Sequence, residues 1–127
     1  MSRAIEAHHS PIIELLLTPD EKQIVTCSED KTIKLWEIET GELLRTFTCD
    51  LSQDIIAIAV SPQGDRLVSS AWDGLLRVWD LESGALLAVF ECGTGGICDL
   101  RFSPDGTQLI GGMDDGLIRF WPWEGMP

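Results

Sequence analysis

Residues 61–80 read SPQGDRLVSSAWDGLLRVWD, a stretch that opens on a Pro-containing turn and closes on a Trp-Asp pair. A second copy, SPDGTQLIGGMDDGLIRFWP, fills residues 103–122, and a weaker copy, TPDEKQIVTCSEDKTIKLWE, fills residues 18–37. Three markers recur with spacings of 43 and then 42 residues, and they are Pro19, Pro62 and Pro104; Asp30, Asp73 and Asp115; and Trp36, Trp79 and Trp121. Self-similarity at one period is typical of repeat architectures.

The match extends outward from these stretches over nearly the whole chain. Gly-Glu-Leu-Leu at residues 41–44 is repeated as Gly-Ala-Leu-Leu at residues 84–87, and Phe47 is repeated as Phe90. The sequence therefore predicts one array over residues 1–127, with repeats at about 8–50, 51–92 and 93–127. Residues 1–7 match the end of a repeat and are expected to form a partial outer strand.

Each repeat has the pattern of four short strands. In the second repeat, apolar runs at residues 55–60, 66–71, 75–80 and 85–91 are separated by turns that contain Pro, Asp and Gly. Runs of this length, bounded by turn residues, indicate strands rather than a helical stripe. A single four-stranded sheet cannot bury both of its apolar faces, so we expect an all-β protein in which successive sheets stack face to face.

The composition excludes several classes of function. The chain has 127 residues, 44% of them hydrophobic, and a net charge of −12, which is typical of one soluble globular domain. Excess acidity disfavours nucleic acid and anionic membranes as partners. No apolar run reaches the roughly 20 residues of a membrane helix, and residues 1–10 carry no apolar signal core, so we expect a cytoplasmic protein.

The four cysteines point to a reducing compartment. Cys27, Cys49, Cys92 and Cys98 show no C-x-x-C spacing and have apolar neighbours. Buried free thiols are therefore the preferred interpretation, with a structural disulfide as the alternative.

These motifs resemble the WD-repeat β-propeller family. The resemblance rests on Ser103-Pro104-Asp105-Gly106, on Asp115-Gly116 with a Trp six positions after the Asp, and on Trp79-Asp80. It implies blades of four antiparallel strands arranged in a ring. It also implies that Asp30, Asp73 and Asp115 fix the turn between the second and third strands of each blade.

The resemblance further implies a hydrogen-bonded chain across a blade, from a His through a Ser or Thr and the turn Asp to the Trp. The first repeat has all four candidates, and they are His8, Ser28, Asp30 and Trp36. The second and third repeats have Ala71 and Met113 at the Ser28 position. We therefore expect those two blades to lose most of this network, leaving Asp73, Trp79, Asp115 and Trp121 as their structural residues.

The number of repeats poses a problem of closure, because propellers close with about four to eight blades. The outer strand of the third repeat is missing from the sequence, and Ala4-Ile5-Glu6 lies 43 residues before Phe47 and matches such a strand. We expect that strand to latch onto another copy, giving a six-bladed homodimer with a subunit junction at Ala4, Ile5, Glu6, Ile118, Phe120 and Trp123. A nine-bladed trimer, a piece of a longer propeller and a hetero-assembly are the alternatives.

Residues that could carry catalysis are scarce. Gly93-Thr94-Gly95-Gly96 lacks the Lys and the helix start of a phosphate loop, and Asp114-Asp115-Gly116 lacks the oxygen spacing of a calcium loop. His8 and His9 have no accompanying metal-ligand pattern. We expect no cofactor, no metal and no catalytic residue, with an enzyme that uses an acidic propeller channel as the less favoured alternative.

A protein-binding surface is the remaining hypothesis. One residue precedes each turn Asp, and these residues are Glu29, Trp72 and Asp114. They are expected on one face of the ring, where Trp72 is the candidate anchor because Trp is enriched at interface hot spots. Acidic neighbours would favour a basic or amphipathic peptide. The alternative is that Trp72 packs on the loop of a neighbouring blade.

Overall fold

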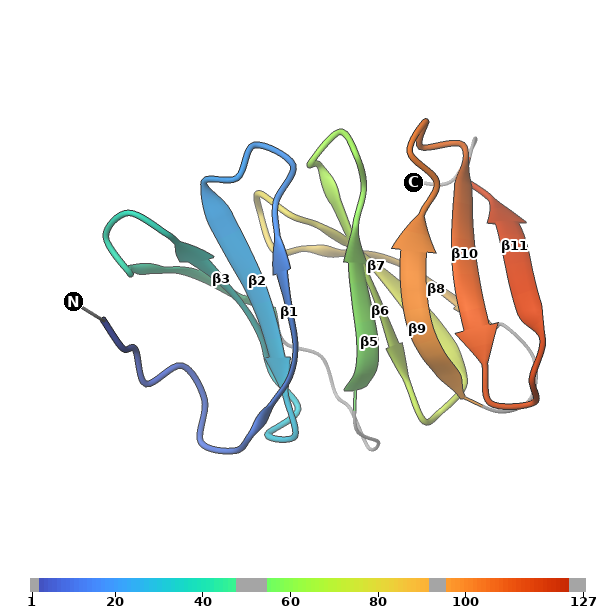
Figure 1. The fold of residues 1–127 in the computed structure, drawn as a ribbon, viewed down its shortest axis with the longest axis horizontal. Coiled ribbons are helices and arrows are strands. Elements are labelled where there is room, and N and C mark those ends of the chain that lie inside the picture. The colour runs from blue at the N-terminus through green and yellow to red at the C-terminus, as the bar shows by residue number, and fades with distance from the viewer. Residues whose placement is uncertain (1–2, 48–54, 92–95, 124–127) are drawn as a thin grey trace.

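The computed structural model describes residues 3–47, 55–91 and 96–123, which form three antiparallel sheets (Figure 1). The first sheet contains β1 (Ile12–Leu17), β2 (Gln23–Ser28), β3 (Ile33–Glu37) and β4 (Leu43–Phe47). The second contains β5 (Ile55–Val60), β6 (Arg66–Ala71), β7 (Leu75–Asp80) and β8 (Leu86–Glu91). The third contains β9 (Ile97–Phe102), β10 (Gln108–Met113) and β11 (Ile118–Pro122). The all-β class and the strands predicted in the second repeat are confirmed.

The strand expected at Ala4-Ile5-Glu6 is not formed. Residues 3–11 contain no strand in this structure. A β-strand needs a neighbouring strand to accept and donate its backbone hydrogen bonds, and the edge that would pair with residues 4–6 is not supplied by the first sheet.

Turn chemistry sets the register of the central hairpin in each sheet. Gly74 has φ of +79° in the β6–β7 turn, and Lys31 occupies the same repeat position in the β2–β3 turn with φ of +69°. Glycine adopts this left-handed conformation without steric cost, whereas lysine does so at a cost. The turn geometry is therefore retained even where the glycine is not.

Two hydrophobic clusters join the three sheets. Alternation along β2 points Val25 and Cys27 toward the second sheet, where they are fully buried against Leu67 and Trp79. The rings of Phe47 and Trp79 meet edge to face with centroids 5.8 Å apart. The second cluster joins the second and third sheets and contains Ala57, Ala59, Val68, Leu76, Val78, Ile97, Leu100, Leu109 and Met113. Each sheet thus covers one apolar face of its neighbour, as stacking of the sheets requires.

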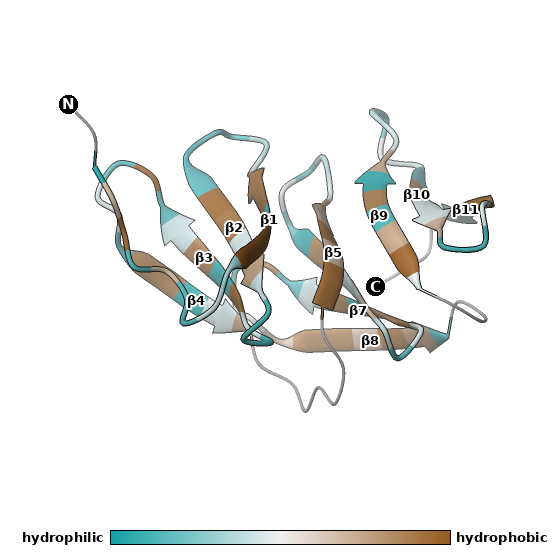
Figure 2. Ribbon diagram, turned by 60° about the horizontal axis from the view of Figure 1, so that its bottom comes forward, coloured by the Kyte–Doolittle hydropathy of each residue, from teal (hydrophilic) through white to brown (hydrophobic). Residues whose placement is uncertain are grey.

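The strands β1, β5 and β9 lie side by side, with β2 and β3 on the left of β1, β10 and β11 on the right of β9, and the remaining strands of the second sheet behind β5 (Figure 1). Apolar residues run along much of β1 and β5 (Figure 2). The turns β2–β3, β6–β7 and β10–β11 all emerge at one end of the strands, at the bottom of Figure 1. Over the described residues, the chain contains no helix that could cross a membrane.

Candidate interaction site

A chain of hydrogen bonds crosses the outward side of the first sheet. His8 has a fully buried side chain, and its Nε2 lies 2.7 Å from the hydroxyl of Thr26. The same hydroxyl accepts a hydrogen bond from Trp36 Nε1 at 3.0 Å. On its other side, His8 Nδ1 lies 3.0 Å from Asp30 Oδ2 and 3.0 Å from the Thr32 hydroxyl. This network ties the segment before β1 to both strands of the β2–β3 hairpin.

Asp30 is the acceptor on which this turn converges. Its carboxylate accepts hydrogen bonds from the backbone and hydroxyl of Thr32 and from the backbone N–H of His9. Burial raises the pKa of Asp30, but the hydrogen bonds from Thr32, His8 and His9 outweigh it and lower the pKa to about 2. The turn therefore holds a carboxylate that stays ionised well into acid.

The expectation that Ser28 is the hydroxyl of this network is wrong. Trp36 pairs with Ile24 across the hairpin, so the hydroxyl in reach on the same face is that of Thr26, two residues further along the strand. Ser28 lies two residues beyond Thr26, where its hydroxyl lies within hydrogen-bond distance of the backbone oxygens of Ser10 and Pro11 and accepts a hydrogen bond from the backbone N–H of Asp30. Ser28 thus secures the start of β1 instead of the Trp.

The third sheet lacks the hydroxyl of this network, in line with the expected loss, whereas the second sheet keeps one of its hydrogen bonds. Ser69 stands at the repeat position of Thr26, and its hydroxyl accepts a hydrogen bond from Trp79 Nε1 at 3.1 Å. The third sheet has Gly111 there, and a Cβ added to it would lie 2.8 Å from the ring of Trp121. The second sheet therefore keeps the bond to its Trp, while in the third sheet the ring lies directly on the backbone.

The role of the turn Asp is the same in all three hairpins. The carboxylates of Asp30, Asp73 and Asp115 accept a hydrogen bond from the backbone N–H two residues later, at 3.0, 3.1 and 3.0 Å. In the second sheet, Arg77 adds an ion pair to Asp73 at 2.8 Å. The turn geometry inferred from the resemblance is confirmed for each repeat.

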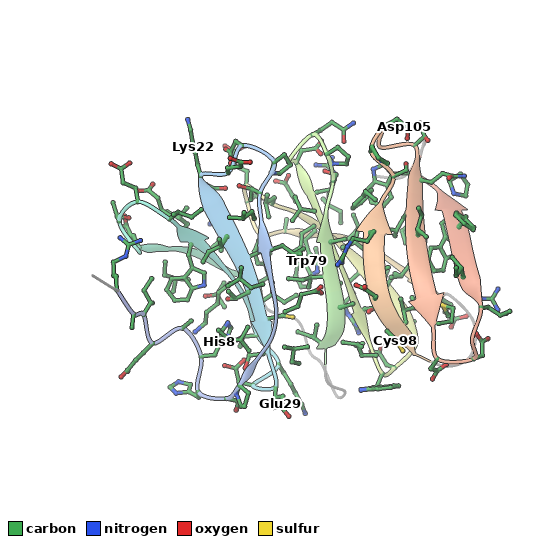
Figure 3. All side chains as sticks on the ribbon, in the orientation of Figure 1. His8, Lys22, Glu29, Trp79, Cys98 and Asp105 are labelled. Carbon is green, nitrogen blue, oxygen red and sulfur yellow. The ribbon has the colours of Figure 1, made fainter. Side chains whose placement is uncertain are left out.

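We call the surface formed by Glu29, Trp72 and Asp114 the turn face. Figure 3 places Glu29 at this end of the strands and Lys22 and Asp105 at the opposite end. The backbone N–H of Glu29 donates to Pro11 O, and that of Asp114 donates to Gly96 O. In the first and third sheets, this repeat position is therefore held by the residue that directly precedes the first strand.

Trp72 and Asp114 are not independent side chains, because both meet Gly96. A Cβ added to Gly96 would lie 2.6 Å from Cζ3 of Trp72, so the indole ring stacks directly on this glycine, which precedes β9. The carboxylate of Asp114 accepts a hydrogen bond from Gly96 N at 3.0 Å. Trp72 still has 52% of its surface exposed. It packs on the neighbouring loop and presents the rest of its ring to solvent.

Glu14 links the three sheets and was missed by the sequence reasoning. One oxygen of its carboxylate accepts a hydrogen bond from Ile58 N of β5 at 2.9 Å, and the other lies 3.6 Å from Arg101 of β9. A single acidic residue in an apolar strand was the available signal, since such a residue needs partners when it is partly buried.

The outward side of the third sheet exposes large apolar side chains. We call the surface formed by Ile110, Gly112, Ile118 and Phe120 the third outer face, since these residues alternate with the ones that face the second sheet. Trp123, expected at a subunit junction, lies elsewhere. Its ring meets Phe102 edge to face at 4.8 Å, within the cluster between the second and third sheets.

The outward side of the first sheet carries an apolar groove. Its floor is formed by Ile24, Thr26 and Trp36, with β1 on one side and the segment at residues 3–7 on the other. That segment is held by Arg3, whose guanidinium donates to the carbonyls of Ile38 and Glu39. We call this groove and its rim the first outer face, defined by Ile5, Ile12, Leu15, Ile24 and Trp36. Ala4, Ile5 and Glu6 are all exposed there.

The comparisons with known proteins agree with this architecture. A family model described as "WD domain, G-beta repeat" matches residues 2–37, 41–80 and 84–122. Two solved structures, titled "Structure of U3-55K" and "Crystal structure of RRP9 WD40 repeats", match with TM-scores of 0.88 and 0.87 at 25% identity. Each match covers 94% of this chain and 38% of the other.

Curated relatives match over single repeats. The chain is 53% identical over 32 residues to "Protein LST8 homolog" of Dictyostelium discoideum, covering 25% of this chain and 10% of that protein. It is 28% identical over 47 residues to "WD repeat-containing protein 26 homolog" of Arabidopsis thaliana, covering 37% of this chain and 8% of that protein. These matches span about a tenth of each relative's length. With three matched repeats and three sheets of propeller type, the chain belongs to the WD-repeat family.

Proposed function

We propose that this chain is a non-catalytic protein-interaction scaffold whose three blades are completed to a ring by a second copy of the chain. The proposal is supported by one observation above all. Repeat positions that are buried between its sheets are exposed on its two outer faces. We also propose a cytoplasmic location, on the basis of the sequence composition.

The third outer face shows this contrast most clearly. Ile118 and Phe120 are 67% and 58% exposed. Their counterparts in the first two repeats are between 0% and 4% exposed, and they are Ile33, Leu35, Leu76 and Val78. Because exposing such side chains to water is unfavourable, a neighbouring sheet at this position would stabilise the protein.

The first outer face, at the other end of the array, shows the same contrast in exposure. Ile12 and Leu15 are 46% and 52% exposed, whereas their counterparts at the internal junctions are at most 2% exposed. These counterparts are Ile55, Ile58, Ile97 and Leu100. The two outer faces therefore have the composition of the two halves of an internal junction.

A homodimer is the simplest assembly that joins these faces without leaving one open. Two copies would give six blades, within the range of about four to eight that close, whereas three copies would give nine. The other candidate is that further blades come from a longer chain. It is favoured by the solved structures, of which this chain covers 38%.

The experiment is the absolute mass of the 127-residue chain in solution, measured by light scattering over a dilution series. We expect twice the 14.0 kDa of one chain, with dissociation on dilution. A mass of one chain at every concentration would reject self-closure and support the longer propeller. Three times the chain mass would replace the dimer with a trimer.

We also propose that the turn face binds a basic protein or peptide. Trp72 offers a half-exposed ring held in place by Gly96, with Glu29 and Asp114 at the equivalent positions of the other two repeats and a net charge of −12 over the chain. Rigid aromatic side chains beside acidic groups suit basic partners. In a fluorescence titration with a Lys- and Arg-rich amphipathic peptide, Trp72→Ala should abolish binding and Trp72→Phe should retain most of it. Equal binding by all three proteins would reject this site.

A further inference from the structure

We propose that the two outer faces meet head to tail, with Phe120 of one copy entering the apolar groove beside Trp36 of the other. This inference rests on the proposed function and specifies its contact. It assigns Phe120 and Ala4 as a pair that is complementary in size across the junction.

The internal junctions show which side chains would fill the groove. Its floor residues Ile24 and Trp36 correspond, one repeat later, to Leu67 and Trp79. In the junction between the first and second sheets, Leu67 and Trp79 are covered by a set of side chains from the first sheet, namely Val25, Cys27, Ile33, Leu35 and Phe47. The counterparts of the first four on the third sheet are Ile110, Gly112, Ile118 and Phe120, which form the third outer face.

We call the proposed contact between the two outer faces the open junction. At this junction, the large and the small side chain have exchanged strands. Each internal junction combines an aliphatic residue on the third strand with a Phe on the fourth, as in Leu35 with Phe47. The next junction repeats the combination with Val78 and Phe90. At the open junction, the third-strand position is Phe120, whereas the fourth-strand position, 43 residues before Phe47, is Ala4. The aromatic ring has moved from one strand to the other.

This exchange favours a second copy as the occupant. A Phe on both strands would overfill the space over the Trp, and two small residues would leave a cavity, and both are unfavourable in a close-packed junction. The pair Phe120 and Ala4 supplies one ring, as each internal pair does. Both residues belong to this chain, so the complementary surfaces are present when two copies meet in a cyclic, heterologous arrangement.

The segment at residues 3–7 already lies beside the groove, which Arg3, Ile5 and Ala7 line. Ile5 packs against Gly41 in the β3–β4 turn, with a contact distance of 3.1 Å from a Cβ built on that glycine. The equivalent turn glycine of the second sheet, Gly84, is covered by Arg45 of β4. Ile5 thus covers the first sheet where Arg45 of β4 covers the second, in the place of the fourth strand of a preceding blade, and a shift of three residues along the sheet brings Ala4 to the position of Phe47.

A size exchange between the two residues tests the pairing. Phe120→Leu should weaken the dimer about tenfold per junction, because the ring contacts over Trp36 are lost. Ala4→Phe should weaken it by a similar factor through overpacking. The double variant should return to within about threefold of the wild-type dissociation constant, since it restores the combination of the internal junctions. Sedimentation equilibrium gives the dissociation constants.

Mixing two variants, each of which has only one outer face intact, tests the head-to-tail geometry. Phe120→Glu leaves the first outer face intact, and Leu15→Glu leaves the third outer face intact. Each variant alone should remain monomeric, and an equimolar mixture should form a heterodimer through one junction. Both residues are exposed in the single chain, so the far-ultraviolet circular dichroism of each variant should match wild type.

The outcomes separate this inference from the proposed function. A wild-type dimer whose Phe120 and Ala4 variants lose affinity additively would overturn the pairing of these two residues. A wild-type dimer for which the mixed variants fail to pair would overturn the head-to-tail contact. Either result would leave self-assembly standing. A wild-type chain that remains monomeric at every concentration would reject both.

Discussion

At the scale of the residue, Asp30 makes the first hairpin sensitive to acid. Its carboxylate, 12% exposed, accepts hydrogen bonds from Thr32 and His9 and lies 3.0 Å from a ring nitrogen of His8. Because these bonds need the ionised form, the lowered pKa is a contribution to the free energy of unfolding that is present when Asp30 is charged.

The pH dependence follows from the sign of this shift. A carboxyl whose pKa is about 2 in the folded chain and about 3.9 in the unfolded chain stabilises the fold above about pH 4, and this contribution is lost as the pH falls toward 2. Asp30→Asn should reduce the free energy of unfolding by about 1 to 2 kcal/mol at pH 7, after allowance for solvent screening. Urea unfolding at pH 7, 4 and 2 should show this difference shrink with acid. A difference that is independent of pH would contradict the role of the charge.

Trp72 and Gly96 form a contact that a single methyl group tests. Gly96→Ala would place a Cβ 2.6 Å from the Trp72 ring, so we expect a loss of about 1 to 3 kcal/mol in the free energy of unfolding. In a Trp72→Ala background, the same substitution should cost far less, because the ring is gone. Gly112→Ala is the matched control, since the space around Gly112 is open within 4 Å. Equal costs of Gly96→Ala in both backgrounds would disprove the stacking.

At the scale of the element, Glu14 joins three inner strands that belong to different sheets. Its bond to Ile58 N satisfies a backbone group on a residue that is fully buried. Adjacent blades are thus connected by a polar contact as well as by their apolar clusters.

Removing this carboxylate should loosen the junctions between sheets. Glu14→Ala should cost about 1 to 3 kcal/mol, because Ile58 N–H loses its acceptor in a buried place. Glu14→Gln should cost less than about 1 kcal/mol, since it keeps an acceptor oxygen and loses only the ion pair with Arg101. Glu82→Ala, at an exposed position, is the control, and the measurement is thermal unfolding followed by circular dichroism. Equal stability of Glu14→Ala and the control would show that the bond contributes nothing.

At the scale of the whole molecule, the reactivity of two cysteines distinguishes stacked sheets from separated ones. Cys27 is fully buried between the first and second sheets, and Cys98 is exposed on the third. Burial, together with the nearby charge of Glu14, raises the pKa of Cys27 to about 12. Cys49 and Cys92 lie outside the described residues.

Thiol labelling should therefore detect the separation of the stacked sheets. Because the thiolate is the reactive form, Cys98 should be modified at least about a hundredfold faster than Cys27 at pH 8. Cys27 should react only as fast as the sheets separate, so its rate should rise with denaturant while that of Cys98 stays nearly constant. Peptide mass spectrometry after timed alkylation distinguishes the two sites. Comparable rates without denaturant would mean that the first junction is open in the native state.

The sequence by itself determined the repeat, the strands and the turns. The spacing of Asp30, Asp73 and Asp115 was sufficient for the hairpins, because each turn Asp bonds a backbone group only two residues away. Short-range geometry of this kind depends only on the order of neighbouring residues.

Contacts between side chains on different strands and sheets depend on the three-dimensional fold. The hydroxyl that reaches Trp36 belongs to Thr26 and not to Ser28, because cross-strand register decides which residue of β2 lies beside the Trp. Glu14 with Ile58, and Trp72 with Gly96, join residues that repeat spacing does not relate. Residues 4–6 form no strand because a strand exists only with its hydrogen-bonding neighbour, and the first sheet does not supply one.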